Sequence, residues 1–131
     1  IQVSGLVNDF FGQRQLQQVF AVSLLGAGQA ITPTVVSPVD VTDNGVNAVD
    51  MEGVLVTIQG VTVQNIDPEV GPGDNAPINE FIVNGGLRVD DYLHPFTLPM
   101  VGDSFTSITG VMRLGNGNYK LIPRDEADIV R

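Results

Sequence analysis

The chain has 131 residues, enough for one domain that buries roughly two-thirds of the surface its unfolded form exposes. It contains no Cys and one His, which excludes disulfides, thiol catalysis and multi-histidine metal sites. Six basic and fifteen acidic residues give a net charge of −9, so the average field of the molecule repels nucleic acids and anionic membranes. No apolar run approaches the ~18 residues of a membrane helix, and we expect no membrane insertion.

The first third of the chain predicts a β-hairpin followed by a loop. Residues 1–7 alternate between apolar and polar side chains with a period of two, and residues 16–25 continue that pattern, so both predict strands. Gly12-Gln13-Arg14 is the predicted turn between them. Residues 26–50 are rich in Gly, Pro, Thr, Asn and Asp, which predicts a loop with at most a short helix that begins at Pro38.

The middle of the chain predicts one long strand and one long loop. Residues 52–63 alternate cleanly to Ile58 and then slip phase at Gln59-Gly60, which indicates a β-bulge or a sharp barrel corner at Gly60. Residues 67–79 contain three Pro and two Gly among carboxylates and amides, so they predict an exposed irregular loop.

The last third predicts two further hairpins. Residues 80–83 and 87–89 bracket Asn84-Gly85-Gly86, and consecutive glycines accept positive φ without strain, as a tight hairpin requires. Residues 104–114 alternate again and lead into Asn116-Gly117, the strongest short hairpin signal in the chain.

About six strands, glycines at bends, long irregular loops and little helix describe a small all-β barrel or sandwich. The tail from Arg124 to Val130 predicts one helical turn that caps a barrel end. No internal repeat is evident, and we expect a single domain over residues 1–131.

Three groups of residues together resemble a known module. They are the opening Val3-x-Gly5-x-Val7 with Asp9-Phe10-Phe11-Gly12-Gln13, the central Glu52-Gly53-Val54-Leu55-Val56, and the close from Gly102 to Val111 and from Tyr119 to Arg124. These segments resemble strands of OB-fold-type modules that are attached to secreted bacterial nucleases of the endonuclease/exonuclease/phosphatase type and to large surface proteins. The resemblance implies an OB-like Greek-key barrel. The alternation and the turn signals leave an immunoglobulin-like sandwich as the alternative fold. The resemblance also implies a secreted or cell-surface location and an accessory role, with oligonucleotide binding as the function suggested by the fold.

Enzymatic activity is not predicted. His94 is the only imidazole, and it lies in a predicted loop without a nucleophile motif around any Ser. Glu52 and Glu80 stand at strand starts, where charged residues usually face water. We therefore expect no catalytic residues and no cofactor.

One acidic loop is a candidate calcium site. Carboxylate oxygens are the ligands that calcium prefers, and four of them fall within or beside the loop of residues 67–79. These candidates are Asp67, Glu69, Asp74 and Glu80. Their order does not match an EF-hand loop, and a solvated acidic loop is the favoured interpretation.

Oligonucleotide binding by an OB barrel needs stacking aromatic rings and cations along a groove. The candidates are Phe10, Phe11, Arg14, Arg88, Tyr92, Arg113, Tyr119 and Lys120. Electrostatic attraction to the phosphate groups normally dominates the affinity of a protein for nucleic acid, so the net negative charge opposes this function. Nucleic acid is therefore an unfavoured partner.

A structural or interaction role is the favoured function. The apolar strands at residues 1–7 and 54–63 carry no charge between their ends, whereas edge strands are usually blunted by charge or proline. An open edge of this kind invites strand addition by a neighbouring chain. We expect association with a second copy or with other secreted or surface domains through the interaction strand Ile1, Val3, Gly5 and Val7. The alternative is the accessory oligonucleotide-binding domain of a secreted nuclease.

Overall fold

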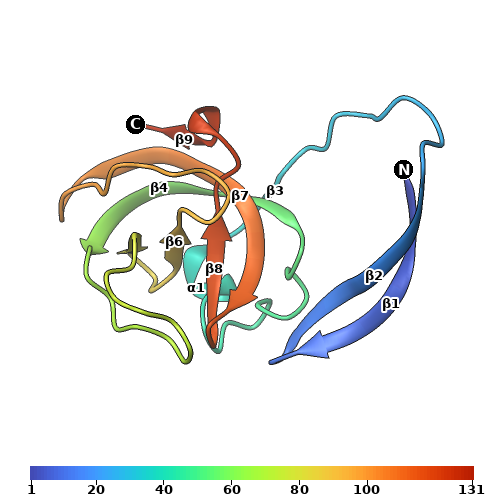
Figure 1. Ribbon diagram of the computed structural model, residues 1–131. Helices are drawn as coiled ribbons and strands as arrows, with labels where there is room; N and C mark the ends of the chain where they lie inside the picture. Colours follow the sequence, from blue (N-terminus) through green and yellow to red (C-terminus); the bar gives the residue numbers. More distant parts are fainter. The chain divides into compact units, whose positions relative to one another are not determined.

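The computed structural model describes all residues from Ile1 to Arg131. It contains nine strands, one α-helix of four residues and one short 3-10 helix, which confirms the all-β prediction. No helix in it is long and apolar enough to cross a membrane. The chain divides into two compact units, residues 1–32 and 33–131, each described here by itself (Figure 1). The single-domain description stays a prediction.

The elements follow one another in a simple order along the chain. The N-terminal unit contains β1 (Gln2–Phe10) and β2 (Gln13–Ser23). The second unit contains β3 (Thr34–Val35), α1 (Pro38–Val41), β4 (Leu55–Asn65), β5 (Glu80–Val83), β6 (Arg88–Asp90), β7 (Ser104–Gly115), β8 (Asn118–Ile122), the 3-10 helix η1 (Glu126–Asp128) and β9 (Ile129–Val130).

The N-terminal unit is an antiparallel hairpin whose turn lies one residue earlier than predicted. Phe10 pairs with Gln13, so the turn is Phe11-Gly12 rather than Gly12-Gln13-Arg14. Both turn residues have positive φ, 52° at Phe11 and 88° at Gly12. Positive φ at both central residues matches the right-handed twist of the flanking strands, and Phe11 adopts it although it has a Cβ atom.

In the second unit, five strands are connected in a ring of pairings. The order β4-β5-β6-β8-β7 returns to β4 through a further β4–β7 pairing, while β3 and β9 add short edges (Figure 1). The β6–β8 pairing is parallel, and the other four pairings of the ring are antiparallel. The ring is partly open because β4 meets β5 only at Val63 and Asn65. One continuous sheet therefore curls upon itself, and two facing sheets of a sandwich are not formed.

Strand β4 bends at Gly60, where the alternation of the sequence slips. Gly60 has a φ of +59°, and the buried side chains change from Ile58 to Val61 across it. The register against β7 is uninterrupted, since Gln59 faces Ser107 and Val61 faces Phe105. The slip is thus a corner of the curled sheet rather than a β-bulge in this pairing.

The core of the second unit lies inside the ring. Its fully or nearly fully buried members come from every long strand, with Phe81, Ile108, Met112 and Leu121 among the largest. Helix α1 begins at Pro38 after Ser37, as predicted, and contributes Val41 to the same core. Burial of these side chains stabilises the unit, because each contributes about 1.5–3 kcal/mol on transfer from water.

The other predicted turns and loops are also found. The segment Asn84-Gly85-Gly86 connects β5 to β6, and Asn116-Gly117 connects β7 to β8 with positive φ at both residues. Residues 67–79 contain no helix or strand. The helical turn predicted in the tail is η1, in which the Ala127 N–H donates to the Asp125 carboxylate.

Candidate interaction surface on the N-terminal hairpin

The hairpin β1–β2 has two chemically different faces. Cross-strand partners project from the same face of a sheet, and Val7 is paired with Leu16. The opposite face carries Gln13, Gln15 and Gln17, whose side-chain amides form a chain of hydrogen bonds. The Gln15 amide donates to Gln13 at 2.8 Å, and the Gln17 amide donates to Gln15 at 3.2 Å. By the same alternation, the Val7–Leu16 side also carries the pair Asp9–Arg14, and the side of the glutamines also carries Leu6 and Phe10. We call these two sides the apolar face and the glutamine face.

No element of the hairpin's own unit covers the apolar side chains, because that unit holds only a two-stranded sheet. Twelve large apolar residues of the hairpin and its flanks are exposed: Ile1, Val3, Leu6, Val7, Phe10, Phe11, Leu16, Val19, Phe20, Val22, Leu24 and Leu25. An isolated two-stranded hairpin is marginally stable in water, and a third strand or a packed face is needed for independent stability. The hairpin is therefore built to be covered.

The hairpin unit carries no net charge, in contrast to the rest of the chain. Its only charged side chains are Asp9 and Arg14, which face each other across the strands. One of the fifteen acidic and one of the six basic residues lie here, so 14 acidic and 5 basic residues remain, and residues 33–131 carry the whole net charge of −9. Two hairpins can approach each other without the repulsion that opposes two barrels.

The predicted interaction strand lies at this surface. Ile1 immediately precedes β1, and Val3, Gly5 and Val7 are within it. A Cβ atom at Gly5 would lie 2.8 Å from the carbonyl oxygen of Gln17, so only glycine permits the two strands to approach this closely. One edge of β1 is paired with β2, and the other edge has no partner in its unit.

The second edge proposed from the sequence is not open. Residues 55–65 form β4, which pairs with β3, β5 and β7. The apolar alternation that suggested a free strand reflects a central strand of the ring, whose side chains such as Val56 and Ile58 are buried. Sequence alone does not separate an uncharged edge strand from an uncharged central one.

The candidate ligand-binding residues are divided between the two units. Phe10, Phe11 and Arg14 belong to the hairpin, where the two phenyl rings form an edge-to-face pair with centroids 4.8 Å apart. The remaining five candidates belong to the second unit, residues 33–131, which we call the barrel unit after its partly open ring of pairings: Arg88, Tyr92, Arg113, Tyr119 and Lys120.

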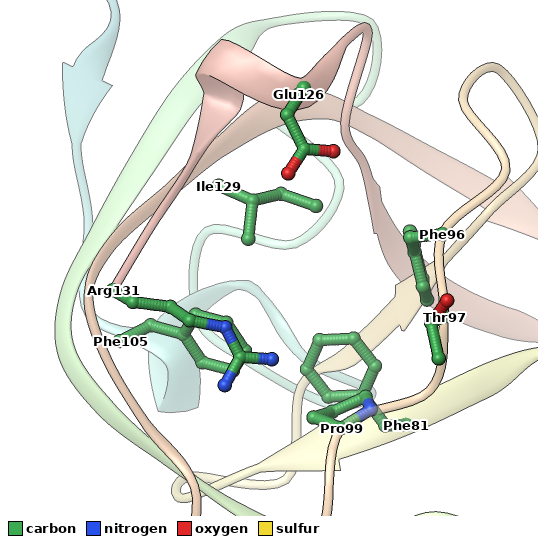
Figure 2. A pocket seen from close by; sticks show the side chains of 8 residues that line it. All are labelled: Phe81, Phe96, Thr97, Pro99, Phe105, Glu126, Ile129 and Arg131. Carbon is green, nitrogen blue, oxygen red and sulfur yellow. The ribbon is translucent and has the colours of Figure 1, made fainter.

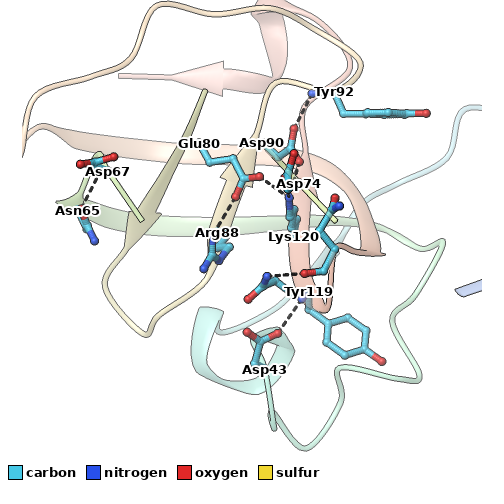
Figure 3. Close-up of polar contacts among 12 residues, drawn as sticks. Asp43, Asn65, Asp67, Asp74, Glu80, Arg88, Asp90, Tyr92, Tyr119 and Lys120 are labelled. Carbon is cyan, nitrogen blue, oxygen red and sulfur yellow. Dashed lines mark hydrogen bonds and ion pairs between the residues drawn. The ribbon is translucent and has the colours of Figure 1, made fainter. Parts of the chain in front are cut away.

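Lys120 and Arg88 are engaged in a buried cluster of charges (Figure 3). The Lys120 ammonium donates to the carboxylates of Glu80 and, at 3.1 Å, of Asp90, and it lies 3.8 Å from the Asp74 carboxylate. Arg88 donates to the second oxygen of Glu80 at 3.2 Å. We call these five residues the ion cluster. Three carboxylates face the two cations, which leaves the cluster a net charge of −1, so neither cation is free to bind a phosphate.

The ion cluster is not evident as a unit from the sequence. Glu80 is paired with Asp90 across β5 and β6, and Arg88 is paired with Lys120 across β6 and β8. Both pairings depend on the order of strands in the ring. The one available signal was that Lys120, the only lysine, alternates with apolar residues inside a strand.

The last barrel candidates are two tyrosines and Arg113. The Arg113 guanidinium lies over the Tyr92 ring, 4.2 Å from its centroid, at the rim of an open cavity of about 330 Å³. The same cavity is lined by Asp74, Asp90 and Asp91, which oppose an anionic ligand. The fifth candidate, Tyr119, has its backbone N–H bonded to Asp43 at 2.7 Å.

Electrostatics around Tyr119 also oppose anions. Burial raises the pKa of its phenol, and the negative charges of Glu52 and Asp43 raise it further. The phenol is therefore neutral at physiological pH. An added phosphate group would meet the same negative field.

The four candidate calcium ligands do not form a group. No three carboxylate or imidazole side chains lie together as the ligands of a metal ion would. Glu80 is held by Lys120 and Arg88, whereas the Asp67 backbone N–H is bonded to the Asn65 side chain at 2.9 Å. Of the four, Asp74 and Glu80 line the cavity beside the ion cluster, while Asp67 and Glu69 are not part of its lining.

A second cavity, of about 180 Å³, lies among aromatic side chains of the barrel unit (Figure 2). Phe81, Phe96 and Phe105 line it together with Arg131, whose guanidinium lies 5.0 Å from the Phe105 centroid. Hydrogen bonds from the Met100 N–H and the Arg131 side chain lower the pKa of Asp103, which anchors Arg131 at 3.1 Å.

The only histidine has an acidic neighbour and no nucleophile. His94 Nε2 lies 3.4 Å from a carboxylate oxygen of Glu126.

No protein-family model, curated protein or solved structure matches the chain. Its function therefore has to be inferred from its own geometry and chemistry.

Proposed function

We propose that this chain is a non-enzymatic structural or interaction module that associates with itself or with partner chains through the hairpin β1–β2. The observation that supports this most strongly is the hairpin itself. It is a two-stranded sheet with large exposed apolar side chains, no net charge and one uncovered edge on each strand. Burial of such a surface favours association by roughly 25 cal/mol for each Å² removed from water.

A neighbouring chain offers what the hairpin lacks. A third strand added to β1 or β2 satisfies their unpaired backbone groups, and a packed layer removes the apolar face from water. In residues 33–131, the long strands already pair with one another in a ring that is only partly open between β4 and β5. A strand or layer supplied from outside is therefore the partner that this surface fits best.

An OB-like barrel is the more specific fold that we propose for residues 33–131. The ring β4-β5-β6-β8-β7 is a five-stranded, partly open Greek-key arrangement of the type described for OB folds. Together with the resemblance to modules of secreted nucleases and surface proteins, it supports a secreted or cell-surface location.

Oligonucleotide binding is the weaker alternative. The exposed Tyr92 with Arg113 stacked on it is the arrangement that favours it, since such pairs accept a base. Against it stand the engagement of Lys120 and Arg88 in the ion cluster and the net charge of −9.

No nucleophile, base and orienting group come together around His94, which supports a function without catalysis.

Two matched double variants of the full chain test the proposed function. Val7→Asp with Leu16→Asp places two charges on the apolar face, at a cross-strand pair. Asn8→Asp with Gln15→Asp places the same two charges on the adjacent cross-strand pair of the glutamine face. The oligomeric state is measured by analytical ultracentrifugation and electron microscopy over a range of concentrations.

We expect concentration-dependent assembly of the wild type and of the glutamine-face variant, and a monomeric apolar-face variant. Circular dichroism serves as a check that all three proteins keep the barrel folded. A wild-type chain that stays monomeric and binds no partner domain up to its highest soluble concentration would overturn the proposal.

A further inference from the structure

The hairpin β1–β2 repeats the architecture of the hairpin β7–β8. Without any gap, Val3–Leu16 aligns with Ile108–Leu121 at a spacing of 105 positions. Only Gly5/Gly110, Gly12/Gly117 and Leu16/Leu121 are identical, which explains why no repeat is evident from the sequence.

The cross-strand register of the two hairpins is the same. Phe10 pairs with Gln13 and Asp9 with Arg14, and the positions 105 residues later, Gly115 with Asn118 and Leu114 with Tyr119, are paired in the same way. Both hairpins close with a two-residue turn in which each residue has positive φ.

The close approach of the strands is repeated as well. A Cβ atom at Gly5 would lie 2.8 Å from the Gln17 carbonyl oxygen, and one at Gly110 would lie 2.5 Å from the Ile122 carbonyl oxygen. Gln17 and Ile122 are again 105 positions apart. The two-residue turn fixes the register of each hairpin, so turn, register and glycine contact together describe one hairpin geometry that both share.

The environments of the two hairpins differ. Ile108, Met112 and Leu121 are 0%, 1% and 0% exposed inside the ring, whereas the equivalent Val3, Val7 and Leu16 are 38%, 79% and 43% exposed. The apolar face of β1–β2 is thus a barrel-lining face that has no barrel around it.

We infer that the hairpin β1–β2 completes a second barrel by docking onto an open three-stranded sheet of the β4–β5–β6 type. In the ring, β7 pairs antiparallel with β4, and β8 pairs parallel with β6. In the same register, a strand of the partner pairs antiparallel with β1 along Val3–Leu6, and another strand of the partner pairs parallel with β2 at Gln15 and Leu16. This inference rests on the proposed function and specifies the partner of the same surface.

Residues 33–103 of this chain supply a defined probe, because they contain β3 to β6 and lack β7 and β8. Isotope-labelled 33–103 fragment is mixed with the unlabelled full chain, and its amide spectrum is recorded by NMR. A peptide of residues 104–131 is the positive control, since it restores the fragment's own hairpin. We expect the full chain and its glutamine-face variant to order the fragment, and the apolar-face variant to leave it unchanged.

A crosslink tests the register of docking, because the chain has no cysteine of its own. Thr57 faces Thr109 across β4 and β7, with hydroxyl oxygens 2.8 Å apart, and Ser4 is the hairpin equivalent of Thr109. A fragment with Thr57→Cys should form a disulfide with the full chain carrying Ser4→Cys under mild oxidation. The full chain carrying Leu6→Cys, two positions out of register, should not.

Separate outcomes distinguish this inference from the proposed function. A fragment that responds to the 104–131 peptide but neither orders nor crosslinks with the full chain overturns barrel completion, even if the full chain still self-associates. If the fragment does not respond to that peptide, a full chain carrying both Gly110→Val and Thr57→Cys is used in its place. Disulfide formation between this chain and the full chain carrying Ser4→Cys then tests the inference. A hairpin that completes the fragment while the full chain stays monomeric supports the inference and rejects self-association.

Discussion

At the scale of single residues, the ion cluster shows how charged side chains of the barrel unit are buried together with partners of opposite charge. Lys120 is 2% exposed and faces three carboxylates, while Arg88 shares one of them. Removal of one partner from a buried pair leaves an uncompensated charge, and that costs more free energy than the pair contributes when intact. The cluster is therefore sensitive to loss of its cation.

Lys120→Met should lower the free energy of unfolding by about 3–5 kcal/mol, because Glu80 and Asp90 would stay buried without their ammonium partner. Urea denaturation followed by circular dichroism measures the change. Arg113→Met, at the cross-strand position next to Lys120, is the matched control and should have a much smaller effect. Equal destabilisation by both variants would show that the cluster has no special role.

The pair Arg124–Asp128 predicts a pH dependence. The Arg124 side chain and backbone N–H hold the pKa of Asp128 below its ordinary value of 3.8, through hydrogen bonds of 2.8 to 2.9 Å. A lowered pKa in the folded state stabilises the protein above the ordinary pKa, and this stabilisation is lost as the pH falls through the folded-state value.

Asp128→Asn should therefore lower the free energy of unfolding by about 1–2 kcal/mol at neutral pH, because charge-assisted hydrogen bonds are replaced by weaker ones. The difference from the wild type should shrink below about pH 4. Thermal melts at a series of pH values measure it, and a difference that does not change with pH would contradict the assignment.

At the scale of elements, Gly60 is the corner that lets β4 contact both β7 and β5. Its φ is +59°, and a Cβ atom there would meet no other atom within 4 Å. Gly60→Ala should destabilise the barrel by about 1–2 kcal/mol for conformational reasons alone. Gly60→Asn should cost less, since Asn tolerates this region. The melting temperatures of the two variants are compared with that of the wild type. An unchanged melting temperature in Gly60→Ala would contradict the role of Gly60 as a corner.

The loop of residues 67–79 allows a direct test of calcium. Because Glu80 is engaged by two cations and the four candidate carboxylates do not gather, we expect identical melting curves in calcium and in chelator. A ligand bound only by the native state raises the melting temperature. A lower melting temperature on chelation, abolished by Asp74→Asn, would restore the calcium hypothesis.

Elements with local signals were predictable from the sequence, whereas long-range placement was not. Local patterns located the seven longer strands but not the two-residue strands β3 and β9, and Asn116-Gly117 located its turn, because these signals depend on neighbouring residues. Phe11 was missed as a turn residue since phenylalanine rarely takes positive φ. The ion cluster and the covered edges of β4 depend on which strands become neighbours, and local patterns carry no information about that.

At the scale of the whole molecule, charge is distributed unevenly: the hairpin is neutral and residues 33–131 carry −9. Salt screens the repulsion between barrels and leaves apolar burial intact. Self-association should therefore persist or strengthen as salt rises, as measured by ultracentrifugation. Binding of labelled single-stranded DNA, followed by anisotropy, should be absent at physiological ionic strength. Tight binding that is lost in Arg113→Ala would favour the oligonucleotide alternative instead.

The pairing of β4 with β7 also has a consequence for the time course of folding. The paired residues are separated by 42 positions at Thr62 and Ser104 and by 56 at Leu55 and Val111. Such non-local pairings require the entropy of loop closure to be lost before their contacts form, which slows folding. During synthesis, β4 is made before β7 exists, so its apolar edge lacks this partner until residues 104–115 have been made.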